Sequence, residues 1–425
     1  MTPWLFVARL PTNHDITATK YLLLEKAKMA SQFGDAAFPL RDKTPTSSTQ
    51  SSGSRTIPAL TGIRFFAAVY VFTFHFGASA LDSAGAPRQI ATLLHNGFFG
   101  VSAFFVLSGF ILAHAHPKTF SSSIDYFNYA ISRFGRIYPT YLFALILALP
   151  LAIESLKPKS ALAVLFMIQS WGGAISDTGY SWIMQAWTLS VELGFYILFP
   201  FLVNRFRRLS QRTLIAFVLI DAVVLIAGAL STIRPGTVTS GGLDITASQN
   251  VPSWLLYVPL PLTRLPEFIL GVLFHCIVRD LPRSPTLRTN IAMYLVTALT
   301  LAVLSSTPNG HVVSIATVLV GGLIALIYKS EASGFTAFLG CRTLRVLGSA
   351  SYALYLLQGP LHAYMLMFVA SPYGRILALP VTVVASIAVW HFIEEPCRIF
   401  MMPFRIKDET TDVENIKAKL IEGRP

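Results

Sequence analysis

Apolar stretches of membrane length recur along this chain from about residue 59 to residue 394, and they limit what it can fold into. A helix needs about 20 apolar residues to cross a bilayer, and only helices or closed barrels satisfy their backbone polar groups there. The chain is 53% hydrophobic and 13% charged, whereas soluble domains carry about 25% charged residues. The sequence therefore predicts an all-α, polytopic membrane helix bundle.

Length divides the apolar segments into about ten full transmembrane helices and one shorter segment. The short segment, 160–171, is expected to be re-entrant or interfacial. The full spans are expected near 59–80, 93–114, 137–153, 185–203, 213–233, 264–278, 287–306, 312–328, 346–370 and 376–394. Together they form one membrane domain, 58–400. A Ser/Thr-rich run without apolar periodicity predicts that the tail 1–57 is disordered, and a second tail covers 401–425.

The distribution of positive charge predicts how this bundle is oriented. If the N-terminus lies inside, the expected cytoplasmic loops hold thirteen Lys and Arg residues and the opposite loops hold six. Cytoplasmic loops normally carry this excess, so both tails are expected in the cytoplasm and the bundle in the plasma (inner) membrane. The net charge of +12 sits in short runs between apolar segments, as in RFRRLSQR at 205–212. That pattern argues against nucleic-acid binding.

No metal site is expected. The three cysteines, Cys276, Cys341 and Cys397, form no CxxC pair. His114 and His116 are two positions apart and therefore point to different helix faces.

The first span, PALTGIRFFAAVYVFTFHF, contains two ionisable residues, Arg64 and His75, eleven positions apart. At about 100° per residue, eleven steps return to within roughly 20° of the starting direction, so the two side chains share a helix face about 16 Å apart. Ionisable residues inside a bilayer normally face the bundle interior or a wet cavity. A second interpretation stays open for each residue: Arg64 could snorkel to the interface, and His75 could be a buried structural histidine.

Three further charged residues stand out. Arg133 and Arg136 are three positions apart on one helix face, expected at the cytoplasmic mouth of the third span. Their planar donor forks suit phosphate, although ordinary anchoring of a helix end also explains them. Glu192 lies inside a span, where a carboxylate needs a cationic partner or a proton. A structural ion pair with one of the arginines is the alternative to a functional role.

These charges together suggest a reaction chamber. A phosphate-bearing cofactor such as coenzyme A (CoA) would bind at Arg64, Arg133 and Arg136, and its slender arm would run along the first helix to His75. Histidine is the side chain best suited to act as a general base at neutral pH. The nearby stretch FFGVSAFFVLSGF is rich in Gly, Ser and Ala, which permits close backbone approach or leaves room for a thin ligand.

Seven motifs occur in a fixed order along the chain. They are LTGIR with the R-x10-H spacing, FFGVSAFFVLSGF, RFGRIYP, WTLSVE, RLPEFILGVLF, SYALYLL and FIEEPCR. On these motifs the chain resembles acyltransferase family 3, a family of integral-membrane acyltransferases, over about 58–400. The resemblance implies transfer of an acyl group, usually acetyl, from cytoplasmic acyl-CoA to hydroxyls of carbohydrate or glycolipid acceptors.

The resemblance also implies roles for individual residues. His75 matches the catalytic histidine of the R-x10-H motif and Arg64 its arginine, while Arg133 and Arg136 match the R-x-x-R motif linked to donor handling. By the same resemblance, Glu192 matches the acid of the W-S-L-S-V-E motif. We expect Glu192 or a neighbouring polar group to orient His75.

Further matches concern the S-G-F element and the end of the domain. The S-G-F element corresponds to Ser108, Gly109 and Phe110, which are expected to contribute to cofactor binding, and Glu394 matches a glutamate of the last span that we interpret as structural. The chain departs from the family after its YLL run, where the family often has a histidine and this sequence has Gln358.

The sequence therefore predicts a membrane O-acyltransferase that uses acyl-CoA, with acetyl-CoA as the expected donor, no metal, and lipid around its apolar surface. Some family members carry a fused extracytoplasmic hydrolase-like domain that completes the transfer. This chain is expected to complete the transfer itself or with a partner protein. The alternative is a transporter or flippase of an anionic solute or lipid-linked glycan, in which the same charges would line a pathway.

Overall fold

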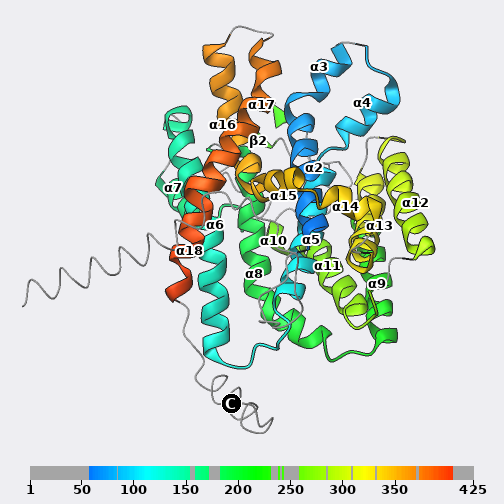
Figure 1. The fold of residues 1–425 in the computed structure, drawn as a ribbon. Helices are drawn as coiled ribbons and strands as arrows, with labels where there is room; N and C mark the ends of the chain where they lie inside the picture. The colour runs from blue at the N-terminus through cyan, green and yellow to red at the C-terminus, as the bar shows by residue number, and fades with distance from the viewer. Residues whose placement is uncertain are drawn as a thin grey trace, which may run out of the picture. The chain divides into compact units, whose positions relative to one another are not determined.

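The structure, a computed structural model, is a bundle of helices (Figure 1). It describes residues 57–404 apart from gaps at 84, 154–157, 172–181, 231–237, 240–241, 244–257, 284–285, 308–309, 331–332 and 370–372. Nearly all of the tails expected at 1–57 and 401–425, and most of the loop 231–257, lie outside the described residues. Within that loop, β1 (Val238–Thr239) pairs antiparallel with β2 (Gly242–Leu243).

Among the described residues, six helical segments are long and apolar enough to cross a membrane. They are α2 (Pro58–Phe76), α6 (Ser123–Ala152), η2 (Met184–Ala186) continued by α8 (Trp187–Phe206), α12 (Leu287–Leu304), α13 (Gly310–Lys329), and the run of α17 (Tyr373–Val389), the π-helical η4 (Trp390–Glu394), α18 (Glu395–Phe400) and η5 (Met402–Phe404). The bent pair α4 (Arg88–His95) and α5 (Phe99–Ala115) makes a seventh if it is one span. The all-helical membrane class is confirmed, but the expected count of ten is not.

Breaks within the expected spans explain part of this difference. The span expected at 93–114 bends by 49° between α4 and α5, and the one expected at 346–370 divides into α15 (Arg342–Ser349) and α16 (Ser351–Phe368). The helix expected at 264–278 is α11 (Leu265–Val278), with 14 residues after the short α10 (Leu260–Thr263). The remaining helices are α3 (Ala78–Ser83), α7 (Pro158–Leu165), α9 (Gln211–Leu230) and α14 (Gly334–Leu339).

Helix α6 begins at Ser123, well before the expected start at 137, because a capping box precedes it. Ser122 Oγ accepts a hydrogen bond from the Asp125 amide (3.2 Å), and the Asp125 carboxylate accepts one from the Ser122 amide (2.9 Å). Arg133 is therefore about 15 Å from the start of the helix. Arg133 and Arg136 therefore lie within this longer helix rather than before its start, and their place at the cytoplasmic mouth of the span stays a prediction.

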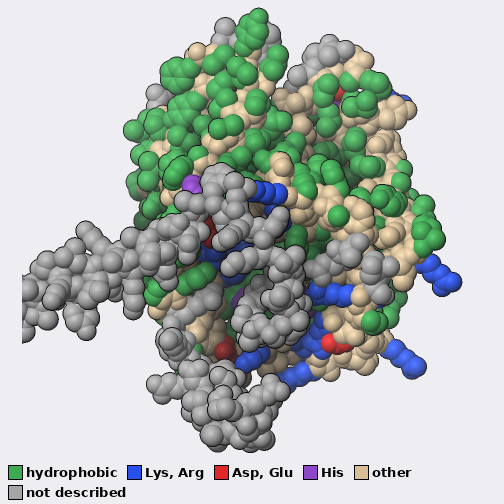
Figure 2. All heavy atoms as spheres, in the orientation of Figure 1, with side chains coloured by type: hydrophobic (Ala, Val, Ile, Leu, Met, Phe, Trp, Pro, Cys, Tyr) green, Lys and Arg blue, Asp and Glu red, His purple; other side chains and the backbone are tan. Residues whose placement is uncertain are grey.

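In Figure 1, α6, α8, α16 and α17 lie on the left of the bundle, α12 and α13 on the right, and α2 and α5 between them. Buried apolar side chains such as Phe105, Phe195 and Phe268 fill the contacts between α5, α8 and α11. Hydrophobic side chains cover most of the upper part of the face drawn in Figure 2, while Lys and Arg side chains gather lower down.

Two glycines bring the backbones of α5 and α11 into direct contact. A Cβ atom on Gly109 would lie 2.1 Å from the carbonyl oxygen of Phe268, and one on Gly271 would lie 2.0 Å from that of Val106. A similar approach holds α2 against α14, where a Cβ on Gly62 would lie 1.9 Å from the carbonyl oxygen of Leu339. Small residues allow this close packing of membrane helices, and it positions α2 and α5, which carry the predicted site residues.

We expect Gly109→Ala to destabilise the protein by about 1–3 kcal/mol, because the new methyl group overlaps a backbone atom that cannot rotate away. Thermal unfolding of the purified protein in detergent measures this. The matched control is Gly322→Ala in α13, where a Cβ would meet nothing within 4 Å. Equal melting temperatures for the two variants would contradict the close contact of α5 with α11.

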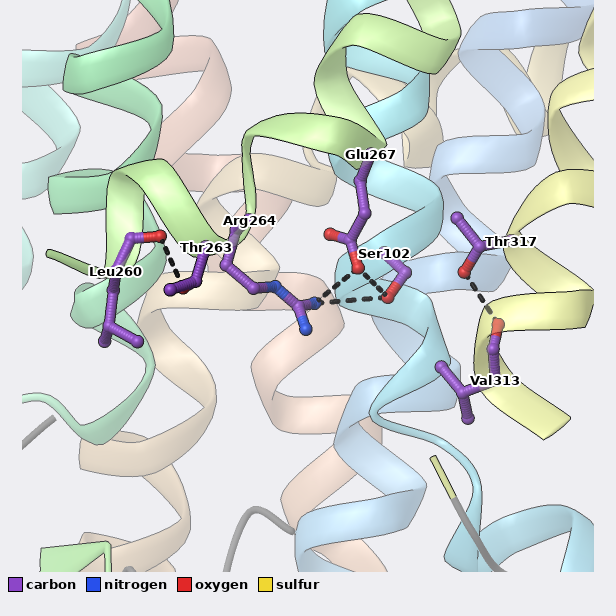
Figure 3. Close-up of polar contacts among 7 residues, drawn as sticks. All are labelled: Ser102, Leu260, Thr263, Arg264, Glu267, Val313 and Thr317. Carbon is purple, nitrogen blue, oxygen red and sulfur yellow. Dashed lines mark hydrogen bonds and ion pairs between the residues drawn. The ribbon is translucent and has the colours of Figure 1, made fainter. Parts of the chain in front are cut away.

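The RLPEF motif forms a partly buried polar cluster at the start of α11 (Figure 3). An Arg264 guanidinium nitrogen lies 3.1 Å from Glu267 Oε1 and donates to Ser102 Oγ at 3.2 Å. Ser102 Oγ also donates to Glu267 Oε1 at 3.0 Å. The Arg264 guanidinium lies 5.5 Å from the centroid of the Phe105 ring. The cluster thus ties α11 to α5 behind Phe105, one of the rings that line the cavity described below.

Candidate active site

A cavity of about 90 Å³ opens among five helices, α2, α5, α6, α8 and α16. Its lining residues are Arg64, Val101, Phe104, Phe105, Leu107, Ser108, Ile111, Leu112, Arg133, Arg136, Ile137, Thr188, Leu189, Glu192, Tyr196, Ser351, Tyr352 and Tyr355. The structure therefore brings together five of the residues expected from the sequence, from four separate helices. They are Arg64, Ser108, Arg133, Arg136 and Glu192.

Three guanidinium groups and one carboxylate share this lining. Glu192 accepts a hydrogen bond from the Tyr196 hydroxyl at 3.2 Å. Within the described part of the chain, no carboxylate lies within ion-pair distance of Arg64 or Arg136, and Glu192 pairs with no arginine. The structural ion pair considered for Glu192 is therefore not seen. Three guanidinium groups against one carboxylate give the described lining an excess of positive charge, which suits an anionic ligand.

Arg64 enters the cavity from α2. It therefore faces the interior of the bundle, as expected for an ionisable residue inside a bilayer. Arg133 and Arg136 enter from the middle of α6. Phosphate groups accept paired hydrogen bonds from guanidinium forks. Three such forks around one space could hold a ligand with more than one phosphate.

The three residues of the S-G-F element point in different directions. Ser108 lines the cavity, whereas Gly109 packs against α11. Phe110 packs edge-on against the rings of His275 and Tyr328, at 5.2 and 5.5 Å between centroids. Consecutive helical residues are about 100° apart and cannot share one face. All three residues of the S-G-F element were expected to contribute to cofactor binding. The structure places Ser108 at the cavity and Gly109 and Phe110 away from it.

His75 lies in the last turn of α2 and, as far as the described residues show, outside the cavity lining. It shares one unbroken helix with Arg64, so about 16 Å of helix separate them. The ring of the next residue, Phe76, stacks on the His362 ring of α16 at 4.0 Å. Glu192 bonds to Tyr196 and forms no described contact with His75. The prediction that Glu192 orients His75 is therefore not supported by the geometry.

The sequence analysis missed several polar residues of the cavity, namely Thr188, Tyr196, Ser351, Tyr352 and Tyr355. The SYALYLL motif contains a signal for Ser351 and Tyr355, because residues four positions apart share a helix face and can line the same cavity. Ser351 and Tyr355 have that spacing, as do Glu192 and Tyr196. Glu394, which we interpreted as structural, is buried in η4.

An apolar helix bundle whose internal cavity is lined by three arginines and a glutamate defines an integral membrane protein with a polar site inside the bundle. A family model described as an acyltransferase domain matches residues 57–394. The chain therefore belongs to acyltransferase family 3, and it is a membrane-bound member of the acyltransferase class.

Curated relatives agree with this family. The chain is 28% identical to acyltransferase MdmB of Streptomyces mycarofaciens, over 71% of this chain and 78% of the relative. It is 25% identical to O-acetyltransferase OatA of Staphylococcus aureus, over 81% of this chain and 57% of the relative. It is 22% identical to peptidoglycan O-acetyltransferase OatA of Listeria monocytogenes, over 80% of this chain and 56% of the relative. The chain thus spans a little over half the length of the OatA relatives. No solved structure matches it.

Proposed function

We propose that this protein transfers an acyl group, in the first instance acetyl, from acyl-CoA to a hydroxyl of a carbohydrate or glycolipid acceptor. The observation that carries the proposal is the cavity in which Arg64, Arg133 and Arg136 meet, with no carboxylate of the described residues within ion-pair distance of Arg64 or Arg136. CoA carries several phosphates at one end, which the guanidinium groups would bind. Family membership favours this enzyme over the transporter considered from the sequence.

The acceptor class is supported by the relatives. Two of them are named O-acetyltransferases, and one is named for peptidoglycan, a polymer of sugars. Transfer to a hydroxyl forms an ester bond between the acceptor oxygen and the acyl carbon and breaks the carbon–sulfur bond of the donor. His75 would accept the hydroxyl proton as general base and then pass it to the departing CoA sulfur.

The proposed orientation places both tails in the cytoplasm and the cavity within reach of cytoplasmic acyl-CoA. The excess of Lys and Arg in the loops expected on that side supports it. Lipid would surround the apolar helix faces of the bundle. On α9, for example, Leu219, Ile220 and Val223 are each more than half exposed.

A binding and transfer assay on the whole chain in detergent tests the proposal. We expect acetyl-CoA to bind, adenosine 3′,5′-bisphosphate to compete with it, and a labelled acetyl group to appear on an N-acetylglucosamine oligosaccharide. Pantetheine, which has the arm but no phosphates, should compete poorly because the arginines then have no partner. A wild-type protein that neither binds nor consumes acetyl-CoA would contradict the proposal.

A further inference from the structure

Within the part of the chain that the structure describes, two buried glutamines have amide atoms without hydrogen-bond partners. Gln185 is 1% exposed, and neither its Nε2 nor its Oε1 has a partner among the described residues. Gln358 is fully buried; its Nε2 donates to the Tyr355 carbonyl at 3.0 Å, but its Oε1 has no partner in the described part of the chain. An unmet group of this kind carries the full desolvation penalty of burial, and buried polar groups are nearly always satisfied in folded proteins. A ligand is one way to satisfy both.

Both amides lie where η2 meets α16. The Tyr355 hydroxyl donates to the backbone carbonyl of Gln185 at 3.4 Å. A Cβ atom placed on Gly359 would lie 2.9 Å from Gln185 Oε1, so the Gln185 amide rests directly on the backbone of α16. Gln358 is the residue immediately before this glycine.

One face of α16 connects the cavity with the end of α2. Seven and eleven helical steps both return to within roughly 20° of the starting direction, so Ser351, Gln358 and His362 share a face. Ser351 lines the cavity, and the His362 ring stacks on Phe76, the neighbour of His75. Gln358 lies about 10 Å beyond Ser351 along the helix. Gln358 therefore lies on the face of α16 that runs from the arginine-lined cavity toward Phe76, and the Gln185 amide rests beside it on Gly359, about 100° around the helix.

The unmet atoms define the chemistry of their partner. They comprise one amide NH₂ donor and two carbonyl acceptors. A phosphate or carboxylate only accepts hydrogen bonds, so it could satisfy the donor but neither acceptor. The partner must both donate and accept, as amides and hydroxyls do. The arm of CoA carries two amide groups between its phosphates and its sulfur.

We propose that Gln185 and Gln358 bind the amide groups of the donor's arm as it passes from the arginine-lined cavity to His75. The inference rests on the proposed function and adds two positioning residues to it. Hydroxyls of a sugar acceptor have related hydrogen-bonding chemistry, and the experiment below separates the two sources.

Affinities for two ligands test this. In Gln185→Leu and Gln358→Leu we expect the Kd for CoA to rise about tenfold, because each variant removes a hydrogen-bonding amide. The Kd for adenosine 3′,5′-bisphosphate, which lacks the arm, should stay unchanged. Gly359→Ala should also weaken CoA binding, since its methyl group displaces the Gln185 amide without removing it. Gln211→Leu is the control, because Gln211 is an exposed residue at the start of α9 whose amide bonds to the Ile277 carbonyl of α11.

The other possible outcomes contradict either this inference or the proposed function. Unchanged CoA affinity in all three variants overturns the inference, and so does a rise confined to the KM of the glycan acceptor. A parallel loss of nucleotide affinity contradicts a role specific to the arm. If the wild type binds neither CoA nor the nucleotide, the proposed function fails instead.

Discussion

Replacing His75 with alanine is expected to lower acyl transfer by about a hundredfold to ten-thousandfold, the usual contribution of a general base. CoA affinity should stay close to that of the wild type. About 16 Å of helix separate His75 from Arg64, and His75 does not line the described cavity. Initial rates of acetyl transfer, combined with a CoA titration of the same preparation, measure both quantities.

His95→Ala is the control for this experiment. His95 also ends a helix, α4, but its side chain is 41% exposed and pairs with Asp82 at 2.8 Å. We expect near wild-type transfer from it. Full activity in His75→Ala would remove the general-base assignment, and loss of CoA binding in that variant would place His75 in the donor site instead.

Arg136→Ala is expected to weaken CoA binding by roughly tenfold to a hundredfold, because a hydrogen bond between charged groups contributes about 1.5–3 kcal/mol. Arg136→Lys should lose less, since it keeps the charge but not the planar fork. At saturating acetyl-CoA the rate of transfer should recover in both variants, in contrast to His75→Ala. Equilibrium binding and the split between KM and kcat distinguish the two kinds of residue.

Arg279→Ala provides the matched loss of positive charge away from the cavity, since Arg279 pairs with Asp280 at 3.0 Å beyond the end of α11. Its CoA affinity should equal that of the wild type. If Arg136→Ala binds CoA as tightly as Arg279→Ala does, Arg136 does not contact the donor's phosphates.

Local geometry made part of the site predictable. Arg64 and His75 lie on one unbroken helix, as their spacing in an apolar run indicated. The cavity also unites Arg64 with Arg133, Arg136 and Glu192, residues first noticed because charge is costly inside a membrane. The helix start before Arg133 was missed because a polar capping box, rather than an apolar run, sets it.

The sequence by itself determined the class of protein, an apolar helix bundle with charges where a bilayer would penalise them, because hydrophobicity and helical spacing are local properties. Only the tertiary structure decided which faces meet. It turned Ser108 to the cavity and Gly109 and Phe110 away from it. It also brought Gln185 beside Gly359, more than 170 positions further along the chain. Such contacts depend on how distant helices pack against one another, which no local pattern encodes.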